Sequence, residues 1–136
     1  MRVVIDTNVL IDAIAERNDY QSAQAIIMAV AEDRIVGMIS ASSITDVHYI
    51  LKKRIGDSKA RLAVMNLLAV FDVAEINAEM CATALSVPMQ DYEDAVLAVC
   101  AKEYGAEYIV SGDKKLIAER NCPIPVLTVQ EMLKNL

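Results

Sequence analysis

The chain has 136 residues, 55% of them hydrophobic and only 4% aromatic, and its formal net charge is −6. This length fits one domain, residues 1–136, with an aliphatic core that needs no disulfide bonds. Without an apolar run long enough for a membrane helix or signal peptide, we expect a cytoplasmic protein. The acidic balance argues against a protein that coats nucleic acid, but it does not exclude a nuclease that gathers carboxylates at one metal site.

Short β-branched segments alternate with helical segments along the whole chain. This order is typical of an α/β domain with a mainly parallel sheet. A cap at Asp57 or Ser58 is expected to begin the fourth helix. The predicted strands are residues 2–5, 36–39, 72–76, 108–110 and 125–127. The predicted helices run over about residues 8–16, 20–33, 42–55, 58–69, 78–86, 91–104, 114–119 and 129–133.

Acidic residues stand close to the ends of several predicted strands. Asp6 follows the first strand, Asp46 comes soon after the second, and Asp113 follows the fourth. Asp91 and Asp94 open the helix that leads into the fourth strand, on neighbouring faces of one turn. Ligands of open parallel sheets bind outside the carboxyl ends of the strands. We therefore expect these acids to meet at one edge of the sheet.

Helix capping is the simpler explanation for each acid taken alone. Asp6, Asp91 and Asp113 stand where N-caps are expected, and segments 43–46 and 91–94 resemble capping boxes. Capping does not explain why several acids converge, because crowded carboxylates repel and raise each other's pKa values. A hard divalent cation such as Mg²⁺ or Mn²⁺ compensates for this repulsion and binds oxygen ligands.

Four segments, in chain order, resemble the PIN-domain family. Residues 5–10 contain Asp-Thr-Asn after a hydrophobic strand, which is similar to the family's opening. Residues 39–46 resemble its second segment, residues 91–95 its third and residues 110–113 its fourth. The resemblance covers nearly the whole chain, and four segments in order are more specific than Asp-Thr-Asn alone.

The resemblance implies a three-layer α/β/α sandwich around a parallel sheet and metal-dependent cleavage of RNA. Family members include the toxins of bacterial toxin–antitoxin modules, so it also implies an antitoxin partner and a homodimer. The metal ligands, Mg²⁺ or Mn²⁺ being the ion, map to Asp6, Asp94 and Asp113.

Four further residues are expected to assist the site. Asp46 is a fourth catalytic acid at a position where the family more often has Glu, and its shorter side chain is expected to act through water. Asn8 is expected to orient the first acid or to contact a phosphate, and Ser111 to orient the last acid or contact a phosphate. Asp91 is expected to support the metal ligands, and ordinary capping and turn formation remain alternatives for these residues.

The densest basic stretch is Lys52-Lys53-Arg54, at the end of a predicted helix. Cations at a helix C-terminus interact favourably with the helix dipole, so a solvated helix end is one interpretation. Contact with the RNA backbone, or with an acidic partner, is the other.

Two residues near the acids are not assigned to the site. His48 lies two positions from Asp46 and so points to another face of the helix. Glu93 is expected to face solvent, away from Asp94. With only one His, a zinc site is not expected.

Two other functions compete with an RNA-cleaving enzyme. Domains that phosphorylate an aspartate also place Asp after the first strand, but Asp6 has no second acid two residues on. A PIN-like fold can also serve as a non-catalytic binding module, and Asp46 in place of Glu leaves that alternative open.

Overall fold

The computed structural model describes residues 1–136 and contains one five-stranded sheet. All neighbouring strands are parallel, as the alternating pattern predicts. Their order across the sheet is β3-β2-β1-β4-β5. The strands are β1 (Arg2–Ile5), β2 (Val36–Ser40), β3 (Asp72–Ala74), β4 (Tyr108–Val110) and β5 (Val126–Leu127).

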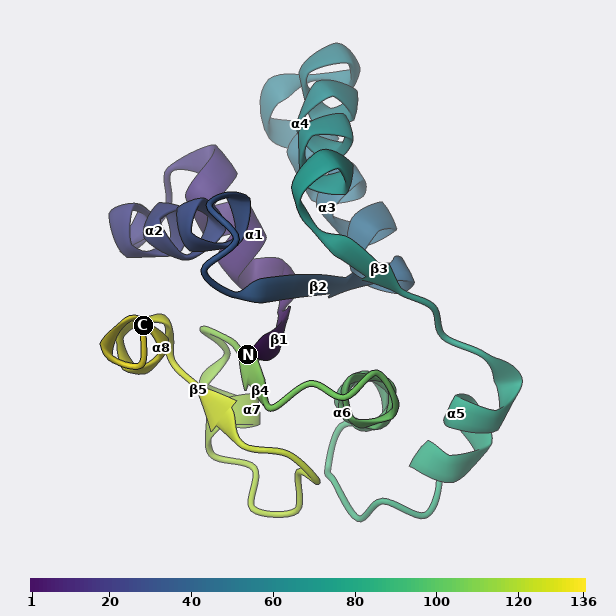
Figure 1. The fold of residues 1–136 in the computed structure, drawn as a ribbon. Coiled ribbons are helices and arrows are strands. Elements are labelled where there is room, and N and C mark those ends of the chain that lie inside the picture. The colour runs from purple at the N-terminus through teal and green to yellow at the C-terminus, as the bar shows by residue number, and fades with distance from the viewer.

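Eight helices accompany the sheet, and Figure 1 shows α1 to α4 on one side and α5 and α6 on the other. The predicted three-layer α/β/α sandwich is confirmed, and the predicted element ends differ from the observed ones by at most two residues. No helix combines the length and the apolar character that crossing a membrane requires. The helices are α1 (Thr7–Ala15), α2 (Tyr20–Ala31), α3 (Ala41–Ile55), α4 (Asp57–Val70), α5 (Ala78–Ala84), α6 (Tyr92–Glu103), α7 (Lys114–Ile117) and α8 (Val129–Lys134).

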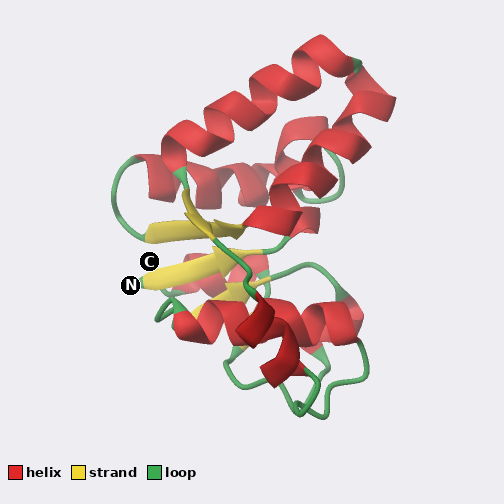
Figure 2. Cartoon of the chain, turned by 90° about the vertical axis from the view of Figure 1, so that its right-hand side faces the viewer, coloured by secondary structure: helices red, strands yellow, loops and turns green.

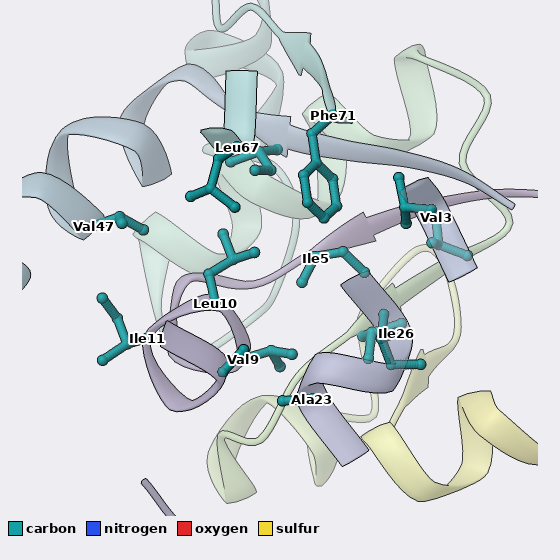
Figure 3. Close-up of a cluster of buried hydrophobic side chains, with 14 of the residues drawn as sticks. Val3, Ile5, Val9, Leu10, Ile11, Ala23, Ile26, Val47, Leu67 and Phe71 are labelled. Carbon is teal, nitrogen blue, oxygen red and sulfur yellow. The ribbon is translucent and has the colours of Figure 1, made fainter. Parts of the chain in front are cut away.

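The sheet separates two hydrophobic cores. Val3 and Ile5 of β1 pack with Leu10 of α1 in the first core, which Figure 3 shows. Val4, between them in sequence, packs with Ala98 of α6 in the second core. Successive side chains of a strand point to opposite faces, so burial of both faces explains why β1 is a continuous apolar run.

The strand order puts a topological switch point at β1. From β1 the chain moves outward to β2 and β3, and it returns later to form β4 and β5 on the other side. At such a point the connections leave the sheet in opposite directions, which opens a crevice at the carboxyl ends of the strands. Asp6, Ser40 and Ser111 occupy the carboxyl ends of β1, β2 and β4.

The start of α3 differs from the prediction. The hydroxyl of Ser40, not that of Ser43, caps the helix and accepts the backbone N–H of Ser43 at 3.3 Å. The predicted capping box over residues 43–46 is therefore wrong, because β2 passes directly into the helix without a loop. Asp46 consequently lies in the second turn of α3, where its side chain is not needed to complete a cap.

The start of α4 also differs from the prediction. Gly56 occupies the cap position with φ of 85°, and neither Asp57 nor Ser58 precedes the helix. Asp57 instead accepts hydrogen bonds from Arg61 Nε at 2.8 Å and pairs with His48 Nε2 at 2.9 Å. This contact links α3 to α4. It engages the only histidine of the chain with Asp57 and not with the acids that follow the strands.

Candidate metal centre

Asp6 is held in place by three hydrogen bonds at the carboxyl end of β1. Its Oδ1 accepts the backbone N–H of Thr7 at 2.9 Å. Its Oδ2 accepts Asn8 Nδ2 at 2.9 Å and the hydroxyl of Ser111 at 2.8 Å. Burial raises the pKa of Asp6 above its ordinary value, and these hydrogen bonds offset part of the rise while the charge of Asp113 adds to it. The hydrogen bonds thus orient the carboxylate, which forms no ion pair with a basic side chain.

The same network joins the end of β4 to the start of α1. Asn8 Oδ1 accepts the backbone N–H of Gly112 at 2.8 Å, and Ser111, which is completely buried, accepts the backbone N–H of Asp113 at 3.0 Å. A Cβ at Gly112 would lie 3.2 Å from Asn8 Oδ1, so this approach favours glycine. Asn8 and Ser111 therefore place Asp6 and Asp113 relative to one another.

Asp94 lies in the first turn of α6 and has a strongly perturbed carboxyl group. Its pKa is raised from 3.8 to about 6, mainly by burial and then by the negative charges of Asp91, Asp6, Asp113 and Glu93. None of the three ion pairs in the structure involves any of these acids. The acids from three separate segments therefore converge without forming an ion pair with a protein cation.

Capping and convergence occur together in this site. Asp91 Oδ1 accepts the backbone N–H of Asp94 at 3.1 Å, and Asp113 Oδ1 accepts the backbone N–H of Lys115 at 2.9 Å. Asp6 caps α1 in the same manner. The caps fix where these carboxylates stand at the helix starts, and the sheet topology brings those starts together.

Asp94 borders two hollows of different size. The smaller, of about 60 Å³, is lined by Asp6, Asp46, Glu93 and Asp94 and by serines from the β2–α3 junction. The larger, of about 670 Å³, is lined by Asp91, Asp94 and Asp113 together with polar residues that follow α7. Asp46 and Asp6 thus border the same small hollow.

Glu93 corrects one expectation. It is exposed, but it lines the small hollow beside Asp94, and its charge contributes to the raised pKa of that residue. A neighbour one position away on a helix points in a different direction, but both side chains can border a crevice at the open end of the helix.

The basic residues divide into two groups. Lys52, Lys53 and Arg54 are exposed in the last turn of α3 and line neither hollow. Lys115 and Arg120, which the sequence analysis did not single out, line the larger hollow. Lys115 follows Asp113 by two residues, so its position in the sequence could have indicated that it lies near the site. Arg120 is brought to the site only by the fold.

The donor set fits a hard divalent cation. The converging donors are carboxylate oxygens, which Mg²⁺ and Mn²⁺ prefer. No three His, Cys, Asp or Glu side chains lie close enough together, as they stand, to hold one ion. Mg²⁺ commonly takes one or two carboxylates and completes its shell with water and substrate phosphate. Asp6, Asp94 and Asp113 are the carboxylates whose charges meet at the switch point.

Solved structures share this fold. VapBC2 from Rickettsia felis, bound to a promoter DNA fragment, has a TM-score of 0.72 at 15% identity and covers 94% of this chain and 98% of its own. VapC20 from Mycobacterium tuberculosis, a toxin that cleaves the Sarcin-Ricin loop, gives 0.66 at 17% identity, with 84% and 92% covered. A toxin–antitoxin complex from Klebsiella pneumoniae gives 0.68 at 21% identity, with 93% and 97% covered.

Comparison of the sequence with protein families agrees with the fold. No curated protein matches the chain. The family model described as PIN domain matches residues 2–115, which include Asp6, Asp46, Asp94 and Asp113. The match spans most of the chain. The chain therefore belongs to the PIN-domain family.

Proposed function

We propose that this chain is a Mg²⁺- or Mn²⁺-dependent endoribonuclease. The observation that carries the proposal is the convergence of Asp6, Asp94 and Asp113 at the switch point, where burial and mutual repulsion raise the pKa of Asp94 to about 6. Carboxylates in a cleft with strongly perturbed pKa values are typical of functional sites. The site contains no paired His and Ser or Cys that would supply a protein nucleophile, so activated water is the attacking group.

Each residue has a role in this mechanism. Asp6, Asp94 and Asp113 would hold the cation, and the bound ion would supply polarisation of the scissile phosphate and a water of lowered pKa. Ser111 and Asn8 keep Asp6 in position through the hydrogen bonds described above. The supporting acids, Asp46 and Asp91, contribute charge from the two hollows that flank Asp94, and Asp46 orients water in the smaller one.

Cleavage of a mixed RNA pool tests this proposal. The purified protein should cut RNA when Mn²⁺ or Mg²⁺ is added and should stop when EDTA removes the ion. Single-stranded DNA of matching sequence, assayed in parallel, shows whether cleavage requires ribose in place of deoxyribose. Absence of cleavage with either ion would contradict the proposed function.

A non-catalytic binding module is the second candidate. Two observations favour it: no three acids stand close enough to share an ion, and Asp46 replaces the commoner Glu. RNA binding without cleavage in the same assay would support it. Phosphorylation of Asp6 is less compatible with the structure, because both carboxylate oxygens already accept hydrogen bonds.

Substitution at Asp46 separates a catalytic acid from a structural one. We expect Asp46→Glu to retain cleavage, because it restores the commoner family residue, and Asp46→Ala to lose less activity than Asp94→Ala. Asp46 is exposed within α3 and is not its cap, so Asp46→Ala should leave the melting temperature nearly unchanged. Melting and specific activity are measured on one sample, and full activity of Asp46→Ala would remove this residue from the mechanism.

We also propose that the chain forms a homodimer and binds an antitoxin. The similar structure from Klebsiella pneumoniae is a toxin–antitoxin complex, and the one from Rickettsia felis is VapBC2 bound to a promoter DNA fragment. Figures 1 and 2 show α3 and α4 projecting from the sheet as a helical pair. On this pair Leu62, Met65 and Leu68 are each at least half exposed, at a helical spacing of three residues. Contact with another protein chain would bury this apolar face.

Sedimentation tests the dimer. The wild-type chain should sediment as a dimer, and Met65→Glu combined with Leu68→Glu should give a monomer, because a charge at the centre of an apolar contact is not compensated. Met28→Glu, at an equally exposed methionine of α2, is the control and should remain dimeric. A monomeric wild type at high concentration would contradict the proposal.

The exposed cations of α3 are also proposed to contact RNA. Lys52, Lys53 and Arg54 lie six to eight residues beyond Asp46 on the same helix. At a rise of about 1.5 Å per residue this is about 9–12 Å, so a strand that extends past the acids is long enough to reach them.

A further inference from the structure

The two hollows beside Asp94 differ in what they can accept. The smaller, about 60 Å³, admits water or an ion but no nucleotide. The larger, about 670 Å³, falls within the range of pockets that receive organic ligands, roughly 300–1,000 Å³. Both are continuous with the acids. An RNA strand that brings a phosphate to Asp94 must therefore lie in the larger hollow.

Hydrogen bonds hold the two walls of the larger hollow together. Glu119, after α7, accepts the backbone N–H of Gln90 at 2.8 Å and that of Asn121 at 3.3 Å. Asn121 Nδ2 donates to the carbonyl of Pro88 at 3.0 Å. The segment before α6 is thus joined to the segment after α7. These contacts connect the two walls of the hollow directly, without a ligand between them.

The charges in this hollow are arranged unevenly. Its acids are Asp91, Asp94 and Asp113 of the proposed metal centre and Glu119, whose carboxylate accepts the backbone N–H groups of Gln90 and Asn121. Its cations are Lys115 and Arg120. Both cations are exposed, and neither takes part in an ion pair. They therefore remain available to bind an anion that the acids alone would repel. Phosphate oxygens are the acceptors that Lys and Arg match best on an RNA strand.

The lining offers no aromatic ring for stacking a base. Ala118 is its only hydrophobic residue, and it contains no aromatic side chain. Proteins that hold unpaired bases commonly stack them on aromatic rings, whereas contacts to phosphate set position without reading sequence. The chemistry of the hollow therefore matches the sugar–phosphate backbone better than the bases.

We propose that the hollow between the start of α6 and the segment after α7 receives the RNA backbone next to the scissile phosphate, with Lys115 and Arg120 binding the adjoining phosphate. The inference rests on the proposed nuclease function and adds the path of the substrate. It assigns affinity to these two residues and leaves sequence preference to other surfaces.

A charge-matched pair of double variants tests the path. Lys115→Gln combined with Arg120→Gln removes both cations, and Lys102→Gln combined with Lys134→Gln removes two exposed cations that line neither hollow. All four positions are exposed, and melting curves verify that both proteins are folded. Binding of a short fluorescent single-stranded RNA is followed by anisotropy in EDTA over a range of salt concentrations. Mn²⁺-dependent cleavage is then measured for oligonucleotides of several sequences.

The expected results differ between the two variants. Each phosphate contact that is lost should reduce the slope of log affinity against log salt by about 0.7, so the hollow variant should lose about 1.4 in slope and the control should not. KM should rise several-fold for every sequence while kcat changes little, because a backbone contact is made equally before and during cleavage.

Three outcomes would overturn the proposed path: a salt slope in the hollow variant equal to that of the wild type, an equal change in the control, or a loss that depends on base sequence. Failure of the nuclease function is a separate result. In that case the wild type binds RNA in EDTA with the expected slope difference but cuts nothing when Mn²⁺ is added.

Discussion

Replacing Asp94 by Asn should reduce metal-dependent RNA cleavage about a thousandfold while leaving the fold intact. Charge stabilisation by a bound cation contributes several kcal/mol to such reactions, and each 1.36 kcal/mol corresponds to a tenfold change in rate. Asn keeps the shape of the side chain but lacks the charge that holds the ion. The same reasoning applies to Asp6→Asn and Asp113→Asn, which alter the other two carboxylates at the switch point.

An Asp→Asn change outside the site provides the matched control. Asp33 follows α2 with φ of 58°, a conformation that Asn also adopts readily. Asp33→Asn should therefore cleave RNA at the wild-type rate. Single-turnover rates at saturating Mn²⁺ distinguish weakened metal binding from a slower chemical step. Full activity in any one of the three site variants would remove that residue from the set of metal ligands.

Much of the fold follows from local patterns that the sequence displays. The apolar run of β1 indicates a strand buried on both faces, and Gly56 and Gly105 mark the ends of α3 and α6. The start of α3 was harder to predict, because Ser40 ends a strand and caps a helix at once. No local sequence pattern indicates that a strand passes into a helix without a loop. The predicted helix start and capping box were therefore placed too far along the chain.

Predicting the site required information of two kinds. The positions of Asp6 and Asp113 after strands predicted that they would share an edge, and the structure places both beside Asp94. The strand order, by contrast, is not present in any local pattern, and it is this order that puts Asp6 at the switch point. Arg120 illustrates the limit, since only the path of the chain after α7 brings it into the larger hollow.

The effect of metal on stability is the second large expectation, and it begins with the protein in EDTA. The folded pKa of Asp94 is about 6, above the ordinary 3.8, so its contribution to stability is fully present below pH 3.8 and is lost as pH rises through 6. At pH 8 the ionised carboxylate therefore opposes folding. Asp94→Asn should melt at a higher temperature than the wild type at pH 8, and the difference should shrink as the pH falls toward 4.

One opposing effect has to be weighed. A carboxylate in the first turn of a helix interacts favourably with the helix dipole, by about 0.3–1 kcal/mol at an exposed site. If that interaction dominated, the pKa of Asp94 would lie below 3.8. Burial and four neighbouring carboxylates instead raise the pKa of Asp94 to about 6, opposite to the direction in which the dipole acts. A less stable Asp94→Asn in EDTA at pH 8 would show that this balance is reversed.

Adding Mn²⁺ at pH 8 should then reverse the order of the two proteins. A ligand at a hundred times its dissociation constant stabilises the folded state by about 2.7 kcal/mol, which for a domain of this size raises the melting temperature by on the order of 10 °C. The wild type should gain this shift because the ion balances Asp6, Asp94 and Asp113 together. Asp94→Asn should gain much less, and Asp33→Asn should behave as the wild type. Equal gains in the wild type and Asp94→Asn would mean that the ion binds elsewhere, even if cleavage had been lost.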